Sequence, residues 1–542
     1  MSSSTTKTGP SFTPTVYRPP YVASNGWLCC CGDAAFFARK ERKPGLNLEH
    51  RPPFLLRMRR IPSSSFAGLL VATCLSAGCG TNAGWFGDAP PDANDLPAAN
   101  ADDAISPIEA SGQVAAAGPA ATRWARAFGK TGSDAVTALV ADAAGNAYIT
   151  GYFSESIDLG CGPHAASGEL DMFVAKLTRE GACVWSAPVS GTSAAWGTAL
   201  ALDAQGSVYV AGQFRGGMKL GAHAFTSTGW IDGFVARFDA AGAPSWVRRV
   251  GDGAMPGVIA VHAGEVALGG AFFGRSNFGG DDLVSEGDED AFIAGYDAAT
   301  GDYRWQRGFG GPAGDSINAL AFDAEGSLTI AGHFEGTLHV ADIALVSAGR
   351  RDAFFAVLAS GGLLLRARRF GGEGDDSVTG GVIDGQDNLV LTGVFQHAMD
   401  LGGLIGMGDN SGFVAKFGPD AEPRWSTAMT ASSHAESLDV VVDEYGDIFV
   451  SGTLTGFPMT GLGTRGARPK LGSNDAFVAQ YSDMGELGWS RIFSTGRNVQ
   501  ARAVTIAGSD LVVVGSFDGT LDAQPAMTSR GATDALIMAI AR

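Results

Sequence analysis

Short apolar runs separated by polar turns fill residues 122–542. The runs VTALVAD (136–142) and AYITGYF (147–153) are rich in β-branched and aromatic residues, and DAAGN (142–146) joins them. Asp and Asn bond their own backbone and Gly accepts positive φ, so DAAGN is typical of a hairpin turn. Many runs are nearly continuous rather than alternating, which is typical of strands covered on both faces. The pattern predicts antiparallel β-strands and no helices.

The strands recur as a long repeat. Seven units begin at a tryptophan or, once, a leucine: Trp124, Trp185, Trp246, Trp305, Leu365, Trp425 and Trp489. The spacings between these positions are 61, 61, 59, 60, 60 and 64 residues. Each unit contains four β segments, and four-stranded sheets stacked radially would cover each other's faces. The predicted fold class is therefore all-β, a seven-bladed β-propeller of four-stranded blades over residues 122–542.

The last unit stops before its tryptophan strand. Its final segment is DALIMAIAR (534–542), whereas the first tryptophan strand, WARAF (124–128), precedes the first complete set of strands. We expect residues 503–540 to supply three strands of the last blade and residues 124–128 to complete it as the outermost strand. Such a shared blade closes the ring and leaves no unpaired inner edge. The alternative, an open solenoid, should have polar capping repeats, and neither end looks different from the rest.

The units resemble the bacterial SBBP-type β-propeller repeat. The resemblance rests on the strand motifs Gly145 to Phe153 (GNAYITGYF) and Asp475 to Ala479 (DAFVA), and it covers about residues 122–542. It implies the propeller fold. It carries no information about activity, because the family has no shared catalytic residue.

The front of the chain looks like a targeting segment. Residues 58–79 start at a methionine followed by two arginines, continue through an apolar run at 66–75 and end in small residues, as signal peptides do. The apolar run is too short to span a bilayer. We expect residues 1–57 to be a non-native extension from an overcalled start or a disordered one. Residues 80–121, rich in Ala, Asp and Pro, are predicted to be a flexible linker.

Leu75 to Cys79 (LSAGC) resembles the lipobox of bacterial lipoproteins, although a serine stands where the family pattern has an aliphatic residue. The resemblance implies a lipoprotein signal peptide with lipidation at Cys79; ordinary cleavage near Ala77 or modification at Cys74 are the alternatives. Several acyl chains would give a stable membrane anchor. Gly80 carries no inner-membrane retention signal. The resemblance therefore implies an exported lipoprotein of the outer membrane or cell surface, or one that faces the periplasm.

Charge is distributed unevenly. Residues 1–60 hold 10 of the 38 Lys and Arg residues and 3 of the 56 Asp and Glu residues. Residues 61–542 therefore hold 28 basic and 53 acidic residues. The predicted propeller is therefore acidic. An acidic surface repels phosphate backbones, so we expect no nucleic-acid partner.

The long, variable links after each second strand share one face of the predicted propeller with the loops that follow the tryptophan strands. Binding usually lies on such loops of a rigid scaffold, so this face and the channel mouth are the expected ligand-binding face. Trp196 and Trp230 are the two propeller tryptophans outside the repeat position, and both fall near these loops. Exposed aromatic rings there would favour a protein or glycan ligand, while packing beneath the loops is the structural alternative.

Other candidate chemistry has a structural explanation. Six units have an aspartate at the start of the third strand, where we expect it to cap the local turn rather than hold a metal: Asp171, Asp232, Asp290, Asp352, Asp475 and Asp534. The oxygen-rich stretch from Asp375 to Asn388 lacks the closing Glu of a calcium loop. The seven propeller histidines occupy different repeat positions. We therefore predict no metal, cofactor or catalytic residue.

Two cysteines remain in the predicted propeller, Cys161 and Cys183. An exported chain favours a disulfide between them. The strand order, however, places Cys161 in a long link on one face and Cys183 near the opposite rim, so the link would have to fold back along the blade. Two free thiols are the alternative.

A monomeric envelope protein that binds a protein or glycan partner is the function that these features favour. The competing hypothesis is an envelope enzyme, a lyase or hydrolase with its site at the channel mouth. An enzyme should break the repeat symmetry with a cluster of unrelated polar residues in one place. We find no such cluster in the sequence.

Overall fold

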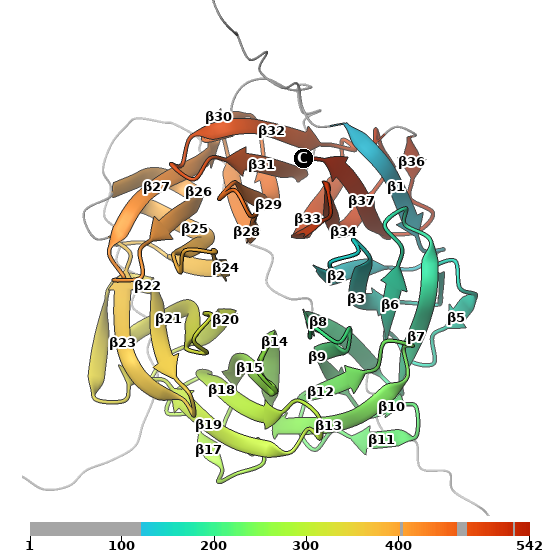
Figure 1. The fold of residues 1–542 in the computed structure, drawn as a ribbon, viewed down its shortest axis with the longest axis horizontal. Helices are drawn as coiled ribbons and strands as arrows, with labels where there is room; N and C mark the ends of the chain where they lie inside the picture. Colours follow the sequence, from blue (N-terminus) through green and yellow to red (C-terminus); the bar gives the residue numbers. More distant parts are fainter. Residues whose placement is uncertain (1–120, 402–404, 463–473, 524–525) are drawn as a thin grey trace, which may run out of the picture. The chain divides into compact units, whose positions relative to one another are not determined.

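The computed structural model describes residues 121–401, 405–462, 474–523 and 526–542, and every regular element in these ranges is a β-strand. The strands form seven four-stranded antiparallel sheets arranged around a central channel (Figure 1). The fold is a seven-bladed β-propeller, as the repeat predicts. No helix long and apolar enough to cross a membrane occurs in these ranges.

The four strands of each blade run from the channel outward. The innermost strands are β2 (Ala135–Ala141), β8 (Ala194–Leu202), β14 (Ala254–His262), β20 (Ser316–Phe322), β24 (Ser377–Ile383), β28 (His434–Val442) and β33 (Asn498–Ala507). The second strands are β3 (Ala147–Phe153), β9 (Val208–Arg215), β15 (Glu265–Phe272), β21 (Leu328–Val340), β25 (Leu389–Asp400), β29 (Ile448–Thr455) and β34 (Asp510–Asp518). The third strands are β6 (Asp171–Leu177), β12 (Asp232–Phe238), β18 (Asp290–Asp297), β22 (Ile343–Ala359), β26 (Ile405–Phe417), β31 (Asp475–Tyr481) and β37 (Asp534–Ala541).

The outermost strands are β7 (Cys183–Gly191), β13 (Pro244–Asp252), β19 (Tyr303–Phe309), β23 (Leu363–Phe370), β27 (Pro423–Ala431), β32 (Leu487–Phe493) and β1 (Thr122–Phe128). Shorter strands lie in the links that follow the second strands: β4 (Ser156–Asp158), β5 (Pro163–Ala165), β10 (Gly217–Leu220), β11 (His223–Thr226), β16 (Arg275–Ser276), β17 (Leu283–Val284), β30 (Pro458–Thr460), β35 (Thr520–Leu521) and β36 (Met527–Thr528). The links of blades one, two, three and seven form hairpins, and in blades four and five they continue β21, β22, β25 and β26. In blade six, β30 pairs instead with β27 of blade five.

The turns between the first and second strands form as their sequence predicts. The Asp142 carboxylate accepts hydrogen bonds from the backbone N–H groups of Ala144 and Asn146 at 3.1 and 2.9 Å. Gly145 has a φ of 82°, which L-residues rarely adopt. The side chain of Asp142 therefore organises the turn locally.

Several repeat tryptophans join their blade to the next one. Trp124 Nε1 donates to the Arg179 carbonyl at 2.8 Å, and Trp185 Nε1 donates to the Ala240 carbonyl at 3.2 Å. The Trp124 ring covers Gly181, where a Cβ atom would lie 2.8 Å from the ring. The tryptophan and glycine positions of the repeat are thus explained by packing between blades.

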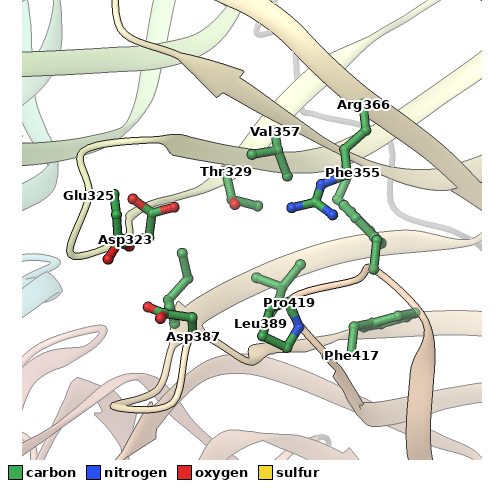
Figure 2. A pocket seen from close by; sticks show the side chains of 13 residues that line it. Asp323, Glu325, Thr329, Phe355, Val357, Arg366, Asp387, Leu389, Phe417 and Pro419 are labelled. Carbon is green, nitrogen blue, oxygen red and sulfur yellow. The ribbon is translucent and has the colours of Figure 1, made fainter.

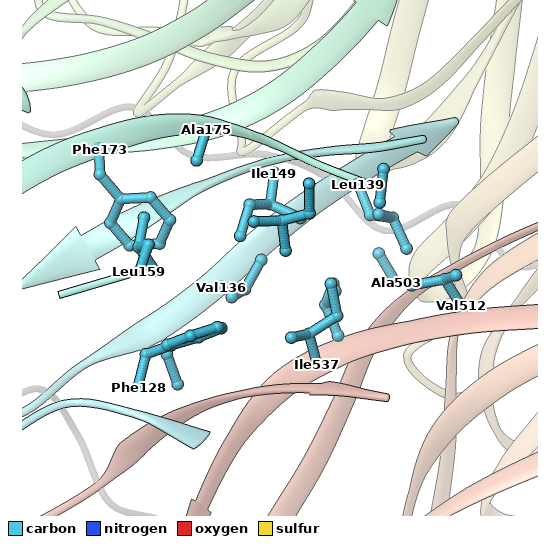
Figure 3. Packing of buried hydrophobic residues seen from close by; sticks show 14 of the residues in the cluster. Phe128, Val136, Leu139, Ile149, Leu159, Phe173, Ala175, Ala503, Val512 and Ile537 are labelled. Atoms are coloured by element: carbon cyan, nitrogen blue, oxygen red, sulfur yellow. The ribbon is translucent and has the colours of Figure 1, made fainter. Parts of the chain in front are cut away.

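The two ends of the propeller meet in one sheet, in the order β1-β37-β34-β33. β1 pairs antiparallel with β37, with Trp124 opposite Ala539 and Phe128 opposite Ala535. Phe128 and Ile537 pack against Val136 of the first blade in one buried cluster (Figure 3). The predicted shared blade is confirmed, and the open solenoid is excluded.

Cys161 and Cys183 form a disulfide with their Cα atoms 5.6 Å apart. Cys161 lies at the tip of the hairpin formed by β4 and β5, and Cys183 begins β7. The hairpin brings the link back along the blade to the outermost strand, which is the path that the strand order requires for this bridge.

Candidate functional site

A ring of β-bulges surrounds the central channel. Each innermost strand has a register shift at the same repeat position. The residues at these shifts are Thr137, Thr198, Gly257, Asn318, Thr379, Leu438 and Arg502, and together they line a cavity of about 230 Å³. Bulges re-aim side chains and occur often beside functional sites. The ring therefore sets which side chains face the channel.

Four members of the bulge ring bond neighbouring blades together. Their side chains donate to a backbone carbonyl of the next blade, from Thr137 to Gly197 (2.7 Å), Thr198 to Pro256 (2.8 Å), Asn318 to Val378 (2.9 Å) and Thr379 to Ser437 (2.7 Å). These residues have a structural role that explains their polarity.

Arg502 departs from this pattern. It is the one charged member of the bulge ring, and its Nε and Nη2 atoms donate only within its own strand, to Gln500 Oε1 at 3.1 and 2.8 Å. Within the described ranges it makes no ion pair with a carboxylate. Arg502 therefore places an unpaired positive charge at the channel.

A pocket of about 560 Å³ lies beside the channel, between blades one and two. Its walls include Tyr152 and Glu169 of blade one, Trp196 and Arg215 of blade two, and Arg502. Arg502 also lines a cavity of about 340 Å³ with Glu436 and Gln500. The two cavities and the bulge ring meet at Arg502, so we treat them as one site, the channel-mouth site.

Trp196 and Trp230 both lie close to the guanidinium of Arg215. The Arg215 Cζ atom is 4.0 Å from the centre of the Trp230 ring and 5.7 Å from that of Trp196. Trp196 is half-buried in the pocket wall, while Trp230 is 67% exposed. The Arg215 Nε atom is buried without a hydrogen-bond acceptor. An aromatic surface with an unsatisfied cation is thus present on the face that carries the hairpin links.

The opposite face also has grooves between blades. One of about 600 Å³ lies between blades two and three, lined by the repeat turns at Asp203 and His262. Another of about 180 Å³ lies between blades four and five, where Figure 2 shows Arg366 extending toward Thr329, with Asp323 and Asp387 nearby. Asp323 accepts the backbone N–H of Ser327 and is part of the repeat turn. This groove is built from repeat turns.

The strand-start aspartates accept backbone hydrogen bonds, as expected for turn caps. Asp171 accepts from the N–H groups of Ser167 and Gly191, both at 2.9 Å. The others with such a bond are Asp232, Asp290, Asp352 and Asp534. Asp384, in the oxygen-rich stretch, caps its own turn and pairs with Lys416 at 2.8 Å.

Three strand-start aspartates face a second buried carboxyl group at a junction between blades. The pairs are Asp534 with Asp134, Asp290 with Asp315, and Asp352 with Asp376. Burial, followed by repulsion from the facing carboxylate, raises the pKa of Asp134 and Asp315 to about 7 and that of Asp376 to about 6. Each pair leaves at least one carboxyl oxygen without a hydrogen-bond donor.

No metal centre emerges from the described part of the chain, where no group of three or more His, Cys, Asp or Glu side chains suits an ion. His333 is enclosed by Asn318 and Ser377, each 3.1 Å from its Nδ1 atom. Burial lowers the pKa of His333 to about 3. Cys79, the predicted lipidation site, lies outside the described residues.

Arg215, Arg502, Tyr152 and Glu169 were not among the site residues predicted from sequence. Arg502 could have been noticed in the sequence. When the seven units are aligned on their bulges, this position holds Arg in the last unit and Thr, Thr, Gly, Asn, Thr and Leu in the others. Arg215 ends an ordinary strand and gives no comparable signal.

The described chain belongs to the class of seven-bladed β-propellers with an open channel-mouth site. No known family model matches the sequence, and no curated protein matches it. Among solved structures it is similar to the quinohemoprotein alcohol dehydrogenase from Comamonas testosteroni, at 13% identity over 79% of this chain and 78% of that one, with a TM-score of 0.36. It is also similar to YCF48 bound to D1 peptide, at 7% identity over 78% and 99% of the chains, with a TM-score of 0.37. Similarity at this level says nothing about activity.

Proposed function

We propose that this protein is a binding module whose ligand, a protein or a glycan, docks at the channel-mouth site. The observation that supports this most directly is the pocket of about 560 Å³ that combines Trp196, Arg215 and Arg502. Its volume is in the range of small-ligand pockets, and aromatic and arginine side chains dominate binding energy in many interfaces. The closed ring beneath it is a rigid support for such a surface.

We propose further that the repeat is of the SBBP type and that a lipid on Cys79 holds the propeller at the cell envelope. The sequence motifs support both statements. Residues 1–120, which include the signal segment 58–79 and the linker, lie outside the described residues.

Glycan-array and pull-down screening with the full chain tests the binding function. The Trp230→Ala and Trp196→Ala variants should lose capture of whatever ligand the wild type retains, because both rings border the cation of Arg215. Tyr445→Ala is the matched control, since Tyr445 is 78% exposed on a repeat turn of the opposite face. Undiminished capture by both tryptophan variants would remove the channel-mouth site from the proposal.

A further inference from the structure

Two arginines at the channel-mouth site have no acidic partner in the described part of the chain. Elsewhere arginines commonly pair with aspartates, as Arg249 does with Asp232 at 2.7 Å. Residues 61–542 hold 53 acidic against 28 basic residues, so carboxylates are abundant. Other arginines, such as Arg237 and Arg366, also form no ion pair in the described ranges, but Arg215 and Arg502 differ from them in lining the same pocket.

The environment of Arg215 leaves its hydrogen-bond donors available. The guanidinium lies 4.0 Å from the Trp230 ring centre, a contact that fixes the guanidinium without using its N–H groups. Its Nε atom is buried and has no acceptor. The terminal Nη groups donate no hydrogen bond to a described residue, so they are the donors left for a ligand. A planar guanidinium matches a carboxylate with two parallel hydrogen bonds.

The remaining lining favours a sugar over a peptide. Thr137, Thr198 and Tyr152 line the pocket, and Trp196 contributes a flat aromatic surface. The two threonine hydroxyls already donate across blade junctions, which leaves them as acceptors toward a ligand. Sugar rings offer hydroxyl groups and apolar C–H faces that match such a lining. An extended peptide would add its main chain to an open strand edge. The edges of β2 and β8 that face the channel are open, but the bulges at Thr137 and Thr198 interrupt the regular spacing that such pairing needs.

We propose that the channel-mouth site binds a carboxylated glycan, with the carboxylate held by Arg215 and Arg502 and a sugar ring against Trp196. This inference rests on the proposed binding function and specifies the ligand class. It assigns to Arg502 a role that the other members of the bulge ring do not have.

The proposal is tested by measuring how tightly an oligogalacturonate hexamer binds to the full chain. Calorimetry and tryptophan fluorescence measure this affinity. A neutral galactan hexamer and hexaglutamate are the comparison probes. We expect the uronate to bind more tightly than either, with an affinity that falls as salt is added. Arg215→Gln and Arg502→Gln should each weaken uronate binding roughly tenfold or more, because each removes a charge-assisted hydrogen bond.

Arg366→Gln is the matched control, because Arg366 lies in the groove of the opposite face (Figure 2). This variant should bind the uronate as the wild type does. Arg215→Lys keeps the charge but loses the planar stack, so it should recover part of the affinity even if Arg215→Gln folds poorly. Thermal melting of each variant verifies its folding.

The proposal is overturned if the neutral hexamer binds as tightly as the uronate, if hexaglutamate binds more tightly, or if no probe binds the wild type. Equal losses in Arg366→Gln and Arg502→Gln would also overturn it. If a neutral glycan or a protein is captured by the wild type and lost in Trp230→Ala, the binding function stands and only the ligand class fails.

Discussion

Replacing Asp134 by asparagine should stabilise the propeller at alkaline pH and not at acidic pH. Asp134 and Asp534 are buried on either side of Gly129, whose φ of 147° and lack of a side chain leave room for the two carboxyl groups. Asp134 Oδ2 and Asp534 Oδ2 both lack a hydrogen-bond donor. A proton on the pair, or an amide in place of one carboxyl group, removes the repulsion and supplies a donor.

The direction of the pH effect follows from the raised pKa. The pKa of Asp134 is about 7 in the folded protein, against an ordinary value of 3.8, chiefly because of burial. Between these values the folded state holds a proton that the unfolded state releases. The free energy of unfolding therefore falls as pH rises through this window and levels off above it.

The size of the effect can be bounded. A shift of about three pKa units corresponds to about 4 kcal/mol at 1.36 kcal/mol per unit. Relaxation and water penetration reduce such values in real proteins, so we expect about 2 kcal/mol between pH 5 and pH 8. Between pH 5 and pH 8 the melting temperature of Asp134→Asn should therefore rise by about 2 to 4 °C relative to that of the wild type. The shift is small because a given free-energy change alters the melting temperature of a long chain less than that of a short one.

Melting temperatures of the two proteins, measured from pH 5 to pH 8, give the assay. The difference in melting temperature between variant and wild type is the informative quantity. The wild-type curve alone combines titratable groups whose effects on stability oppose each other. His333, whose pKa burial lowers to about 3, contributes stability that is lost as pH falls below its ordinary 6.5. It is present in both proteins, so it cancels in the difference.

Asp142→Asn is the matched control for the same substitution. Burial alone would raise the pKa of Asp142, but hydrogen bonds from Asn146 and the Lys176 ion pair at 3.4 Å outweigh it and hold that pKa below the ordinary 3.8. This variant should lose stability by the same amount at pH 5 and pH 8. A gap between Asp134→Asn and wild type that does not grow with pH would refute the account of the buried pair.

Two further perturbations test the closure and the disulfide. Deleting residues 122–128 should lower the melting temperature sharply, because the loss of β1 exposes the edge of β37 and removes Phe128. Truncation of a buried phenylalanine alone costs about 3 kcal/mol. Deleting residues 81–115 should leave the melting temperature unchanged, and equal melting temperatures of the two deletion variants would contradict the shared blade. Replacing Cys161 and Cys183 together by serine should lower the free energy of unfolding by about 3 kcal/mol for a bridge across 22 residues, and an unchanged urea midpoint would show that the bridge adds nothing.

The fold could be predicted from sequence because the same pattern of strands and turns recurs seven times. Each unit carries similar apolar strands, five of the seven carry the same turn aspartate and, with one exception, all begin with the same tryptophan, so local signals and the global ring agree. The missing last tryptophan strand then located the closure. The carboxyl pairs were not predicted, although Gly129, Gly310 and Gly371 each precede a buried aspartate by five residues, at Asp134, Asp315 and Asp376. Pairing with a strand-start aspartate across a blade junction becomes visible only in space.

The site was harder to predict than the fold because it depends on departures from the repeat. Trp196 and Trp230 were found by their position outside the repeat, and the structure sets both beside Arg215. Arg215 itself was missed, because a strand-ending arginine in an acidic surface looks like an ordinary solvated charge. Only the two tryptophan rings around it distinguish it, because Arg237 and Arg351 also have a buried Nε atom without an acceptor.

Arg502 shows how symmetry separates structural from functional positions in this ring. A threonine or asparagine there would donate to the neighbouring blade, as Thr137, Thr198 and Asn318 do, and such a bond contributes about 1 kcal/mol. Arg502 forgoes that bond at the junction between blades seven and one, as Gly257 and Leu438 do at theirs. The junction of blades seven and one is held instead by the buried cluster around Phe128, which contains residues of both blades (Figure 3). Because this cluster already joins the two blades, the seventh blade can present a free cation to the channel without a bond from Arg502 to its neighbour.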